Sequence, residues 1–540
     1  MQHSSVYEAF AATAARTPEA DFLFTESVTA EVYGIPAGAL SWRSALAQVQ
    51  ELRAAYGQAG WGHGHRVGLL LENRPAFLLH WFALNALGVS VVPINAEMRL
   101  AEFTYLIGHS EIELVVSLPQ RIADLQEAAR QAGRPLATMT LESGDIPRPF
   151  TPAPRAGEAV GLASECALLY TSGTTGRPKG CIMPNEYFLR AGQWYAELTE
   201  VAEYRRDRER VMTPLPLNHV NAMAFSAMVV LVGGGCLVQL DRFHPKSWLQ
   251  SARESGATIV HYLGVMPAML LSVPEVAADR QHQIRWGFGA GVDKKNHAPF
   301  EARFGFPLVE AWAMTETGAA ACIMANREPR HVGMSCFGRL EDFVEVRLVD
   351  DDGADVADGT PGEMLVRASG PDPRRYFFQG YLKDEAATDE AWAGGWFHTG
   401  DVVRRDAEGN MYFVDRKKNV IRRSGENISA VEVESVLNQH PAVHASAVAA
   451  TPDAVRGDEV VACIVLKPGQ AADEVLAASI VAHALRQLAY YKAPGYVAFV
   501  EALPLTASQK IQRGELRVLA QGLPGQAHCV DTRHLKKRTD

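Results

Sequence analysis

Short apolar runs alternate with amphipathic helical patterns through most of the chain. Residues 65–73 (HRVGLLLEN), 89–95 (VSVVPIN) and 113–118 (ELVVSL) contain continuous apolar runs, which are typical of strands buried on both faces. Residues 74–88 (RPAFLLHWFALNALG) have the apolar spacing and the length of a helix. This alternation predicts an α/β fold with a largely parallel sheet.

The pattern changes near Gly353. Residues 343–353 (FVEVRLVDDDG) and 362–368 (GEMLVRA) predict short antiparallel strands. From about residue 419 onward, a compact βαβ-like segment is expected to fold on its own. With 540 residues the chain is too long for one hydrophobic core, so at least two domains are expected.

Composition narrows the class of protein. Apolar residues make up 47% and charged residues 21%, which is typical of soluble globular proteins, and the net charge of −10 argues against a broad surface for nucleic acid or an anionic membrane. Seven cysteines without metal-ligand spacing, and an N-terminus without a signal peptide, predict a cytoplasmic protein. Residues 221–240 carry no charge, but Gly233-Gly234-Gly235 divides them, which predicts a buried helix and strand rather than a membrane span.

The string YTSGTTGRPKG, residues 170–180, predicts a phosphate-binding loop. Its glycines let backbone N–H groups approach an anion, its hydroxyls donate hydrogen bonds and its lysine supplies a positive charge. The spacing is not that of a Walker A loop, since Pro178 precedes the lysine and Gly180 follows it. The residues assigned to phosphate binding are Thr171, Ser172, Gly173, Thr174, Thr175, Gly176 and Lys179.

This string and a series of later motifs resemble the adenylate-forming superfamily, which includes acyl-CoA synthetases, adenylation domains of peptide synthetases and firefly luciferases. The later motifs, in chain order, are PLNHVNA (216–222), FGAGVD (288–293), EAWAMTET (310–317), GWFHTGD (395–401), VDRKKNVIRRSGENIS (414–429) and PLTASQKIQR (504–513). The resemblance covers nearly the whole chain. In the last motif, Gln509 stands where the family usually has glycine.

The resemblance implies a fold, domain boundaries and a reaction. The fold is a large N-terminal domain of stacked α/β subdomains with a β-barrel-like part, followed by a small mobile α+β C-terminal domain. The domains are 1–415 and 419–540, with a hinge at 416–418. The reaction is that of an ATP-dependent carboxylic acid–CoA ligase: a carboxylate attacks the α phosphorus of ATP, pyrophosphate leaves, and the acyl group then passes to CoA with release of AMP.

The same resemblance assigns the nucleotide site. Asp401 and Arg416 are expected at the ribose, and Trp312 stands where the family usually has a stacking tyrosine. Thr315 is expected at the α phosphate and Glu316 at Mg²⁺, a hard cation that prefers oxygen ligands. The remaining assignments to the adenine wall are Gly289, Ala290, Glu310 and Ala311, and Thr175 is the second magnesium ligand.

The resemblance also assigns residues to each of the two half-reactions. Lys510 corresponds to the catalytic lysine of adenylation, where an ammonium group between two anions lowers their repulsion. Lys418 is the pivot of the domain rotation, and Gly425 lines the tunnel for the pantetheine arm. Arg422 and Arg242 are assigned to cofactor binding, the latter near the CoA phosphates.

The acyl pocket is the least defined part of the site. His219 is expected to gate it or to touch the carboxylate, and residues 261–265, Trp286 and 319–323 are expected to line it. A quaternary ammonium group would pack against Trp286 and Tyr262, whereas a distal carboxylate would pair with Arg285 or His261. The sequence as a whole resembles crotonobetaine/carnitine–CoA ligases most, and we expect the substrate to be a small or medium polar acid.

Alternative functions make different predictions. A stand-alone adenylation domain that loads a carrier protein would share every ATP motif, and a luciferase-like oxygenase would also adenylate a carboxylate. A non-enzymatic binding module would not need every catalytic position filled. A dinucleotide-binding protein is excluded, since GFGAGVD lacks the third glycine at the required offset. The oligomeric state stays open, with a homodimer as one alternative.

Overall fold

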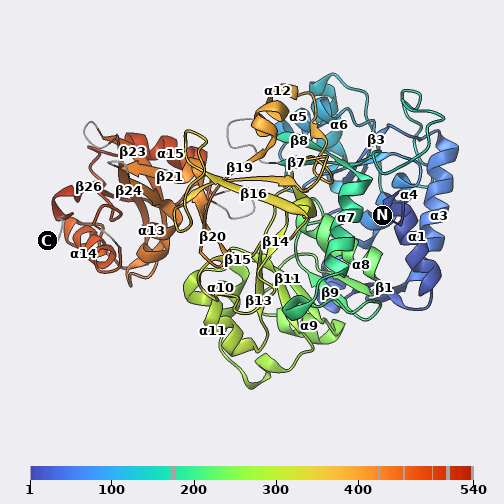
Figure 1. The fold of residues 1–540 in the computed structure, drawn as a ribbon. Coiled ribbons are helices and arrows are strands. Elements are labelled where there is room, and N and C mark those ends of the chain that lie inside the picture. Colours follow the sequence, from blue (N-terminus) through green and yellow to red (C-terminus); the bar gives the residue numbers. More distant parts are fainter. Residues whose placement is uncertain are drawn as a thin grey trace.

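Four β-sheets organise the described part of the chain, three of them in a large N-terminal part and one in a smaller C-terminal part (Figure 1). The structure is a computed structural model that describes residues 2–171, 178–423, 426–453, 457–488, 490–505 and 511–536. At residues 418, 422, 426, 427 and 457 it describes the backbone alone.

The two largest sheets are mostly parallel. The first has the strand order β14 (Ile323–Met324), β13 (Leu308–Trp312), β12 (Trp286–Ala290), β11 (Ile259–Leu263), β9 (Arg210–Thr213), β10 (Cys236–Gln239), β1 (Asp21–Thr25) and β2 (Gly38–Ser41). The second has the order β18 (Gly380–Tyr381), β8 (Lys179–Pro184), β7 (Glu165–Thr171), β4 (Ser90–Pro93), β3 (Arg66–Leu70), β5 (Leu114–Ser117) and β6 (Ala137–Met139). Their inner strands are parallel, and antiparallel pairs occur toward the edges.

Helices cover both faces of the second sheet, which explains its continuous apolar strands. On one face, Phe103 of α5 and Leu125 of α6 pack on Leu70, Val92 and Val115. The other face joins the main core with α1, α3, α4, α7 and α8. The helices of the N-terminal part are α1 (Val6–Arg16), α2 (Ser27–Tyr33), α3 (Trp42–Ala59), α4 (Pro75–Asn85), α5 (Leu100–Ser110), α6 (Ile122–Ala132), α7 (Asn185–Ala196), α8 (Ala227–Gly233), α9 (Trp248–Ser255), α10 (Val265–Ser272), α11 (Lys294–Phe304) and α12 (Glu385–Ala391).

The third sheet is antiparallel throughout and leads to the C-terminal part. Its order is β15 (Cys336–Gly338), β20 (Met411–Arg416), β19 (Phe397–Arg405), β17 (Gly362–Ala368) and β16 (Val344–Val349). In Figure 1 its strands extend from the large part toward the orange and red C-terminal part. The predicted antiparallel strands at 343–353 and 362–368 are confirmed as β16 and β17.

The C-terminal part has its own sheet and its own buried clusters. The sheet order is β22 (Glu426–Ser429), β21 (Val420–Arg423), β24 (Gly457–Leu466), β25 (Tyr496–Phe499) and β26 (Cys529–Asp531), with β23 (Val443–Asp453) also paired to β24. Its helices are α13 (Ala430–Leu437), α14 (Glu474–Leu485) and α15 (Arg513–Gly522). Two buried apolar clusters contain only residues from Ile421 onward, while the main core ends at Met411.

The buried carboxylate of Asp415 contacts both parts. Asp415, near the end of β20, accepts a hydrogen bond from the Arg416 N–H at 2.7 Å. Its other oxygen accepts from the Ser429 hydroxyl at 3.0 Å and from the Val431 N–H at 3.2 Å. Since Ser429 is also the N-cap of α13, Asp415 fixes the first turn of this helix against β20.

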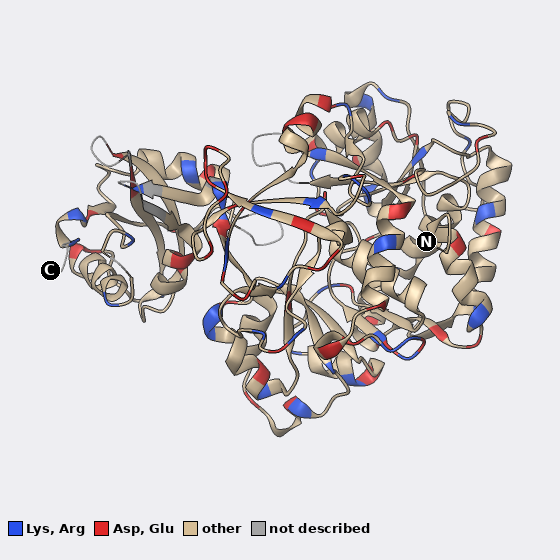
Figure 2. Cartoon of the chain, viewed as in Figure 1, with Lys and Arg blue, Asp and Glu red and all other residues tan. Residues whose placement is uncertain are grey.

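The predicted strands and helix between residues 65 and 118 are confirmed as β3, α4, β4 and β5. The uncharged segment 221–240 forms a π-helix (Asn221–Ser226), then α8 and β10, as a buried helix followed by a strand. Within the described ranges, no helix is both long and apolar enough to cross a bilayer. Figure 2 shows Lys and Arg interspersed with Asp and Glu along the described elements.

Candidate active site

A cavity of about 850 Å³ lies between the carboxyl ends of β12 and β13 and the C-terminal part. Its wall in the N-terminal part includes residues 290–295 and 310–313, and its wall in the C-terminal part includes Val431, Glu432 and Ser435 of α13. Ligands in α/β proteins bind at the carboxyl ends of parallel strands. Of the residues predicted to bind nucleotide, those that border the cavity are Ala290, Glu310, Ala311, Trp312, Asp401 and Arg416.

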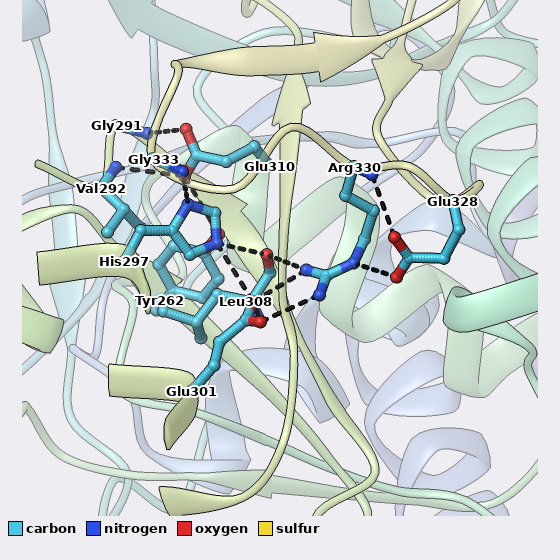
Figure 3. Close-up of polar contacts among 10 residues, drawn as sticks. All are labelled: Tyr262, Gly291, Val292, His297, Glu301, Leu308, Glu310, Glu328, Arg330 and Gly333. Atoms are coloured by element: carbon cyan, nitrogen blue, oxygen red, sulfur yellow. Dashed lines mark hydrogen bonds and ion pairs between the residues drawn. The ribbon is translucent and has the colours of Figure 1, made fainter. Parts of the chain in front are cut away.

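Glu310 fixes the loop that forms one side of this cavity (Figure 3). One carboxylate oxygen accepts from the Gly291 N–H at 3.1 Å, and the other accepts from the Val292 N–H and the Tyr262 hydroxyl, both at 3.1 Å. Burial raises the pKa of Glu310, and these donors oppose the rise. Gly289 lies so close to the Tyr262 carbonyl that an added Cβ would be 2.3 Å from its oxygen, so only glycine fits there.

A partly buried ionic network supports the same wall (Figure 3). The Arg330 guanidinium binds both oxygens of Glu301, at 2.8 and 2.9 Å, and also binds Glu328 at 2.9 Å. His297 Nε2 lies 3.2 Å from Glu301 and 3.0 Å from the Leu308 carbonyl. Because Leu308 begins the strand that carries Glu310, the network couples α11 and the loop at 328–333 to the cavity wall.

The buried Trp312 and Asp401 and the partly exposed Arg416 form a second polar group at the cavity. The Trp312 indole N–H donates to Asp401 Oδ2 at 2.8 Å, and Arg416 Nε lies 2.6 Å from Asp401 Oδ1. No N–H of Arg416 is aligned on Oδ1, so this ion pair leaves Oδ1 buried without a hydrogen-bond donor among the described residues. Burial raises the pKa of Asp401, while Arg416 and Trp312 oppose the rise.

Glu316, predicted to bind magnesium, and Lys179, predicted to bind phosphate, both contact Tyr381. Glu316 is buried, and its Oε1 accepts a hydrogen bond from the Tyr381 hydroxyl at 2.9 Å. The Lys179 ammonium lies 4.7 Å from the centre of the same ring, a cation–π distance. The Thr315 carbonyl accepts from the Tyr187 hydroxyl at 2.8 Å, which attaches this loop to α7.

Other predicted residues lie apart from these contacts. His219 is exposed in the segment before the π-helix, and Arg242 is exposed with its Nε 3.7 Å from Asp241. Thr171 ends β7 opposite Lys179 in the strand register. For Lys418 and Arg422 the structure describes only the backbone. The predicted residues outside the described ranges are Ser172, Gly173, Thr174, Thr175, Gly176, Gly425 and Lys510.

Two expectations for the acyl pocket are wrong. The side chain of Trp286 has no exposed surface, and its indole N–H points to the Glu203 carbonyl at 3.4 Å, so it belongs to the core. The Arg285 guanidinium pairs with Glu209 and, at 3.1 Å, with Glu203, so it is neutralised by this chain's own carboxylates. Both partners lie some eighty residues earlier in the chain, and the sequence around Trp286 does not reveal them.

Sequence reasoning missed two polar side chains that the structure brings into the site region. Tyr381 lies in a two-residue strand far from Glu316 in the sequence, and only the pairing of β18 with β8 brings it there. Asn221 begins the π-helix and bonds to the buried His261. For Asn221 a signal was present, because it belongs to the PLNHVNA motif two residues after His219.

Known proteins match this chain over most of its length. The model of the family described as AMP-binding enzyme matches residues 10–382, and that of the AMP-binding enzyme C-terminal domain matches residues 432–510. A sulfoacetate–CoA ligase of Cupriavidus necator is 31% identical over 490 residues, which cover 88% of this chain and 92% of the relative. A crotonobetaine/carnitine–CoA ligase of Salmonella typhimurium is 29% identical over 467 residues, 84% of this chain and 88% of the relative.

Solved structures share the fold. The anthranilate CoA ligase AuaEII in complex with anthranoyl-AMP has a TM-score of 0.80 at 22% identity, covering 96% of this chain and 98% of its own. ATP-bound MatB from Rhodopseudomonas palustris has a TM-score of 0.78 at 23% identity, covering 96% of this chain and 99% of its own.

The predicted fold class, mixed α/β with a large N-terminal and a small C-terminal domain, is confirmed. The resemblance to the adenylate-forming superfamily and the predicted enzyme class, an AMP-forming acid–thiol ligase, are confirmed as well. The chain therefore belongs to the AMP-binding enzyme family.

Proposed function

We propose that this chain activates a small polar carboxylic acid with ATP and transfers the acyl group to coenzyme A. In the first step a carboxylate oxygen forms a bond to the α phosphorus, the bond from that phosphorus to the bridging oxygen breaks, and pyrophosphate leaves. In the second step the CoA thiolate bonds to the acyl carbon, and AMP leaves. The buried group around Asp401 carries this proposal.

Asp401 offers a hydrogen-bond acceptor where a ribose would need one. Asp401 borders the cavity, and its buried Oδ1 forms an ion pair with Arg416 but has no aligned hydrogen-bond donor among the described residues. Leaving a buried acceptor without a partner is costly, and a ribose hydroxyl is a donor that would satisfy it. Trp312 holds Oδ2, and Arg416 supplies a positive charge beside Oδ1.

Lys179, Tyr381 and Glu316 would lie at the phosphate end of the nucleotide. Lys179 and the hydroxyls of 171–176 would hold the leaving pyrophosphate. Mg²⁺ in nucleotide sites uses one or two carboxylates together with phosphate oxygens, which fits Glu316 with Thr175 as a second ligand. The described residues hold no cluster of three side chains that could bind a metal alone, so the metal would arrive with ATP. Bound there, it would neutralise phosphate charge.

The two half-reactions would use different residues of the C-terminal domain. Under this proposal the domains are 1–415 and 419–540, with the hinge at 416–418. Lys510 bridges the carboxylate and the α phosphate during adenylation. After rotation about Lys418, Gly425 lines the path of the pantetheine arm, and Arg422 and Arg242 bind the cofactor.

The aromatic packing in the interior next to the catalytic loop favours a small acid over a long one. There, rings of α7, the π-helix and the neighbouring strands pack against one another: Phe225 and Phe288 have centroids 5.4 Å apart, and Trp194 lies 5.8 Å from Phe225. Tyr195 and His261 also contact Phe288, at 5.1 and 4.9 Å. A packed aromatic cluster leaves little volume for a long alkyl chain. The named relatives act on sulfoacetate and on crotonobetaine or carnitine, which are small and polar.

The cellular setting belongs to the proposal as well. The seven cysteines are free thiols, and six of them are buried. Free thiols suit a reducing compartment, which supports a cytoplasmic enzyme. The alternative of a homodimer stays a prediction.

The test is a panel of carboxylic acids assayed for pyrophosphate release, with and without CoA. We expect small polar acids to release pyrophosphate slowly alone and rapidly with CoA, with one AMP formed per thioester. Efficient turnover of an acid of about sixteen carbons, with no activity on short acids, would contradict the substrate class. Adenylation without transfer to CoA would favour the alternative, a stand-alone adenylation domain that loads a carrier protein.

A further inference from the structure

A chain of buried polar groups ends at the surface of the proposed acyl region. His261, on β11, has no exposed surface. Its Nε2 lies 2.9 Å from the Tyr195 hydroxyl, and its Nδ1 lies 2.7 Å from Asn221 Oδ1 and 2.9 Å from the Ser226 hydroxyl. Burial lowers the pKa of His261 to about 3, so the imidazole is neutral at pH 7 and carries one proton.

Hydrogen-bond satisfaction fixes which nitrogen carries that proton. The Tyr195 hydroxyl is buried, and His261 Nε2 is the one acceptor that the described residues offer it. Since buried donors are paired, Tyr195 donates to Nε2, and the proton of His261 is therefore on Nδ1. Nδ1 in turn donates to Asn221 Oδ1, the closer of its two neighbours.

The same logic orients the Asn221 amide. Its oxygen is held inward by His261, so its NH₂ group points away from the imidazole. The hydrogen bond of this side chain within the described residues runs through its oxygen to His261, and the side chain is half-buried at the first turn of the π-helix. A π-helical turn within a helix is frequently found at functional sites. Asn221 thus presents two fixed donors at the edge of a packed aromatic cluster.

Helix α7 connects this amide to the catalytic loop. Near its start, Tyr187 donates to the Thr315 carbonyl, and near its end Tyr195 donates to His261. The helix packs both against the turn Gly318–Ala320, which follows Glu316, and against the π-helix that Asn221 begins. Helix α7 thus contacts both the segment around Thr315 and the π-helix, and under the proposed function the acyl substrate would extend from its carboxylate near Thr315 toward the π-helix.

We propose that Asn221 binds the distal group of the acyl substrate, and that this group is a hydrogen-bond acceptor with negative charge, such as a sulfonate or a second carboxylate. The inference rests on the proposed function and narrows its substrate class. An amide NH₂ group cannot donate a hydrogen bond to a quaternary ammonium group, because that group carries no acceptor. Asn221 is a binding residue in this scheme, while His261 and Tyr195 are positioning residues that keep its donors outward.

Asn221→Asp is the decisive variant. The aspartate oxygen still accepts from His261 Nδ1, but the outward group becomes an anion that repels a second anion. The assay is ATP–pyrophosphate exchange with sulfoacetate, malonate, propionate and carnitine, and the readout is kcat/KM for each dianionic acid divided by kcat/KM for propionate. The wild-type ratio should favour the dianionic acids, and the variant should lower it by about 10- to 150-fold, the worth of a hydrogen bond to a charged group.

Two further variants distinguish the loss of a positioning contact from a general loss of folding. Tyr195→Phe removes the donor to Nε2 and frees His261 to change tautomer, so the Asn221 amide can turn and the ratio should fall. Ser226→Ala removes another hydroxyl from the same imidazole without breaking the Tyr195–His261–Asn221 chain, and the ratio should stay as in the wild type. General loss of folding would lower activity on all acids together and would leave the ratio in place.

The outcomes distinguish this inference from the proposed function. Exchange that prefers propionate or carnitine in the wild type, or an equal ratio in the wild type and Asn221→Asp, would overturn the role of Asn221 while leaving an acid–CoA ligase. Absence of exchange with every acid would overturn the proposed function itself and the inference with it.

Discussion

Replacing Trp312 by phenylalanine tests the proposed ribose site most directly. The change keeps an aromatic ring at the cavity but removes the indole N–H that donates to Asp401 Oδ2 at 2.8 Å. Both side chains are almost fully buried, so water cannot replace the lost donor well. A hydrogen bond to a buried charge contributes about 1.5–3 kcal/mol. We therefore expect ATP to bind about 10- to 150-fold more weakly.

The same variant has a signature in its pH dependence. Burial raises the pKa of Asp401, and Arg416 and Trp312 oppose that rise. Without the indole donor the pKa of Asp401 rises further. Because the ionised carboxylate is the proposed acceptor, ATP affinity falls as the pH drops through this pKa, and the acid limb should move to higher pH in Trp312→Phe.

The measurement is the dissociation constant for ATP by calorimetry across a pH series, together with the melting temperature as a check on folding. Trp312→Tyr is the matched control, since a tyrosine ring carries a hydroxyl donor and the family usually has tyrosine at this position. We expect it to bind ATP nearly as the wild type does. A Trp312→Phe variant with unchanged affinity and an unchanged acid limb would refute the reasoning.

Three further predictions address the half-reactions and the wall of the site. Lys510→Ala should lose adenylation by orders of magnitude yet still form thioester from a supplied acyl adenylate; equal loss in both steps would refute the division of labour. Lys418→Pro should keep adenylation but lose thioester formation, because proline restricts φ to about −65° and should block the rotation. Normal CoA-dependent turnover would place the pivot elsewhere. Arg330→Leu removes the guanidinium partner of the partly buried Glu301, which keeps His297 and the Leu308 N–H, and should cost about 1.5–3 kcal/mol in urea unfolding. Burial raises the pKa of Glu301, but Arg330 and His297 outweigh burial and lower it to about 2, so the stabilisation is complete above pH 4.5 and is lost as the pH falls toward 2; a cost independent of pH would contradict this account.

The elements that were predicted correctly are those whose signal is local. The runs that became β3, β4 and β5 are apolar at nearly every position because helices cover both faces of their sheet. The motifs around Glu310 and Asp401 also identified residues that do border one cavity. The Glu310 motif lies at the end of β13 and in the turn that follows it, where ligands of α/β proteins bind, whereas Asp401 lies within β19.

What the sequence did not reveal depends on partners from distant segments. The sequence alone predicts that Arg285 is available for a substrate carboxylate, but Glu203 and Glu209 neutralise it in the structure. Tyr381 carried no motif, and its contact with Glu316 requires an edge strand to pair with β8. The tautomer of His261 depends on Tyr195 and Asn221, which lie 66 and 40 residues away. Such side chains acquire their role from tertiary packing, which periodicity does not encode.

The carboxylate of Asp415 has a consequence for the timing of catalysis. It lies just before the predicted hinge, while the groups it binds, the Ser429 hydroxyl and the Val431 N–H, lie beyond it. Rotation about residues 416–418 would have to break both bonds, and each bond to a carboxylate contributes about 1.5–3 kcal/mol. Asp415 would then act as a latch that stabilises the described orientation of the C-terminal part and slows its change to the other. A side chain outside the nucleotide contacts would thereby contribute to the interval between the two half-reactions.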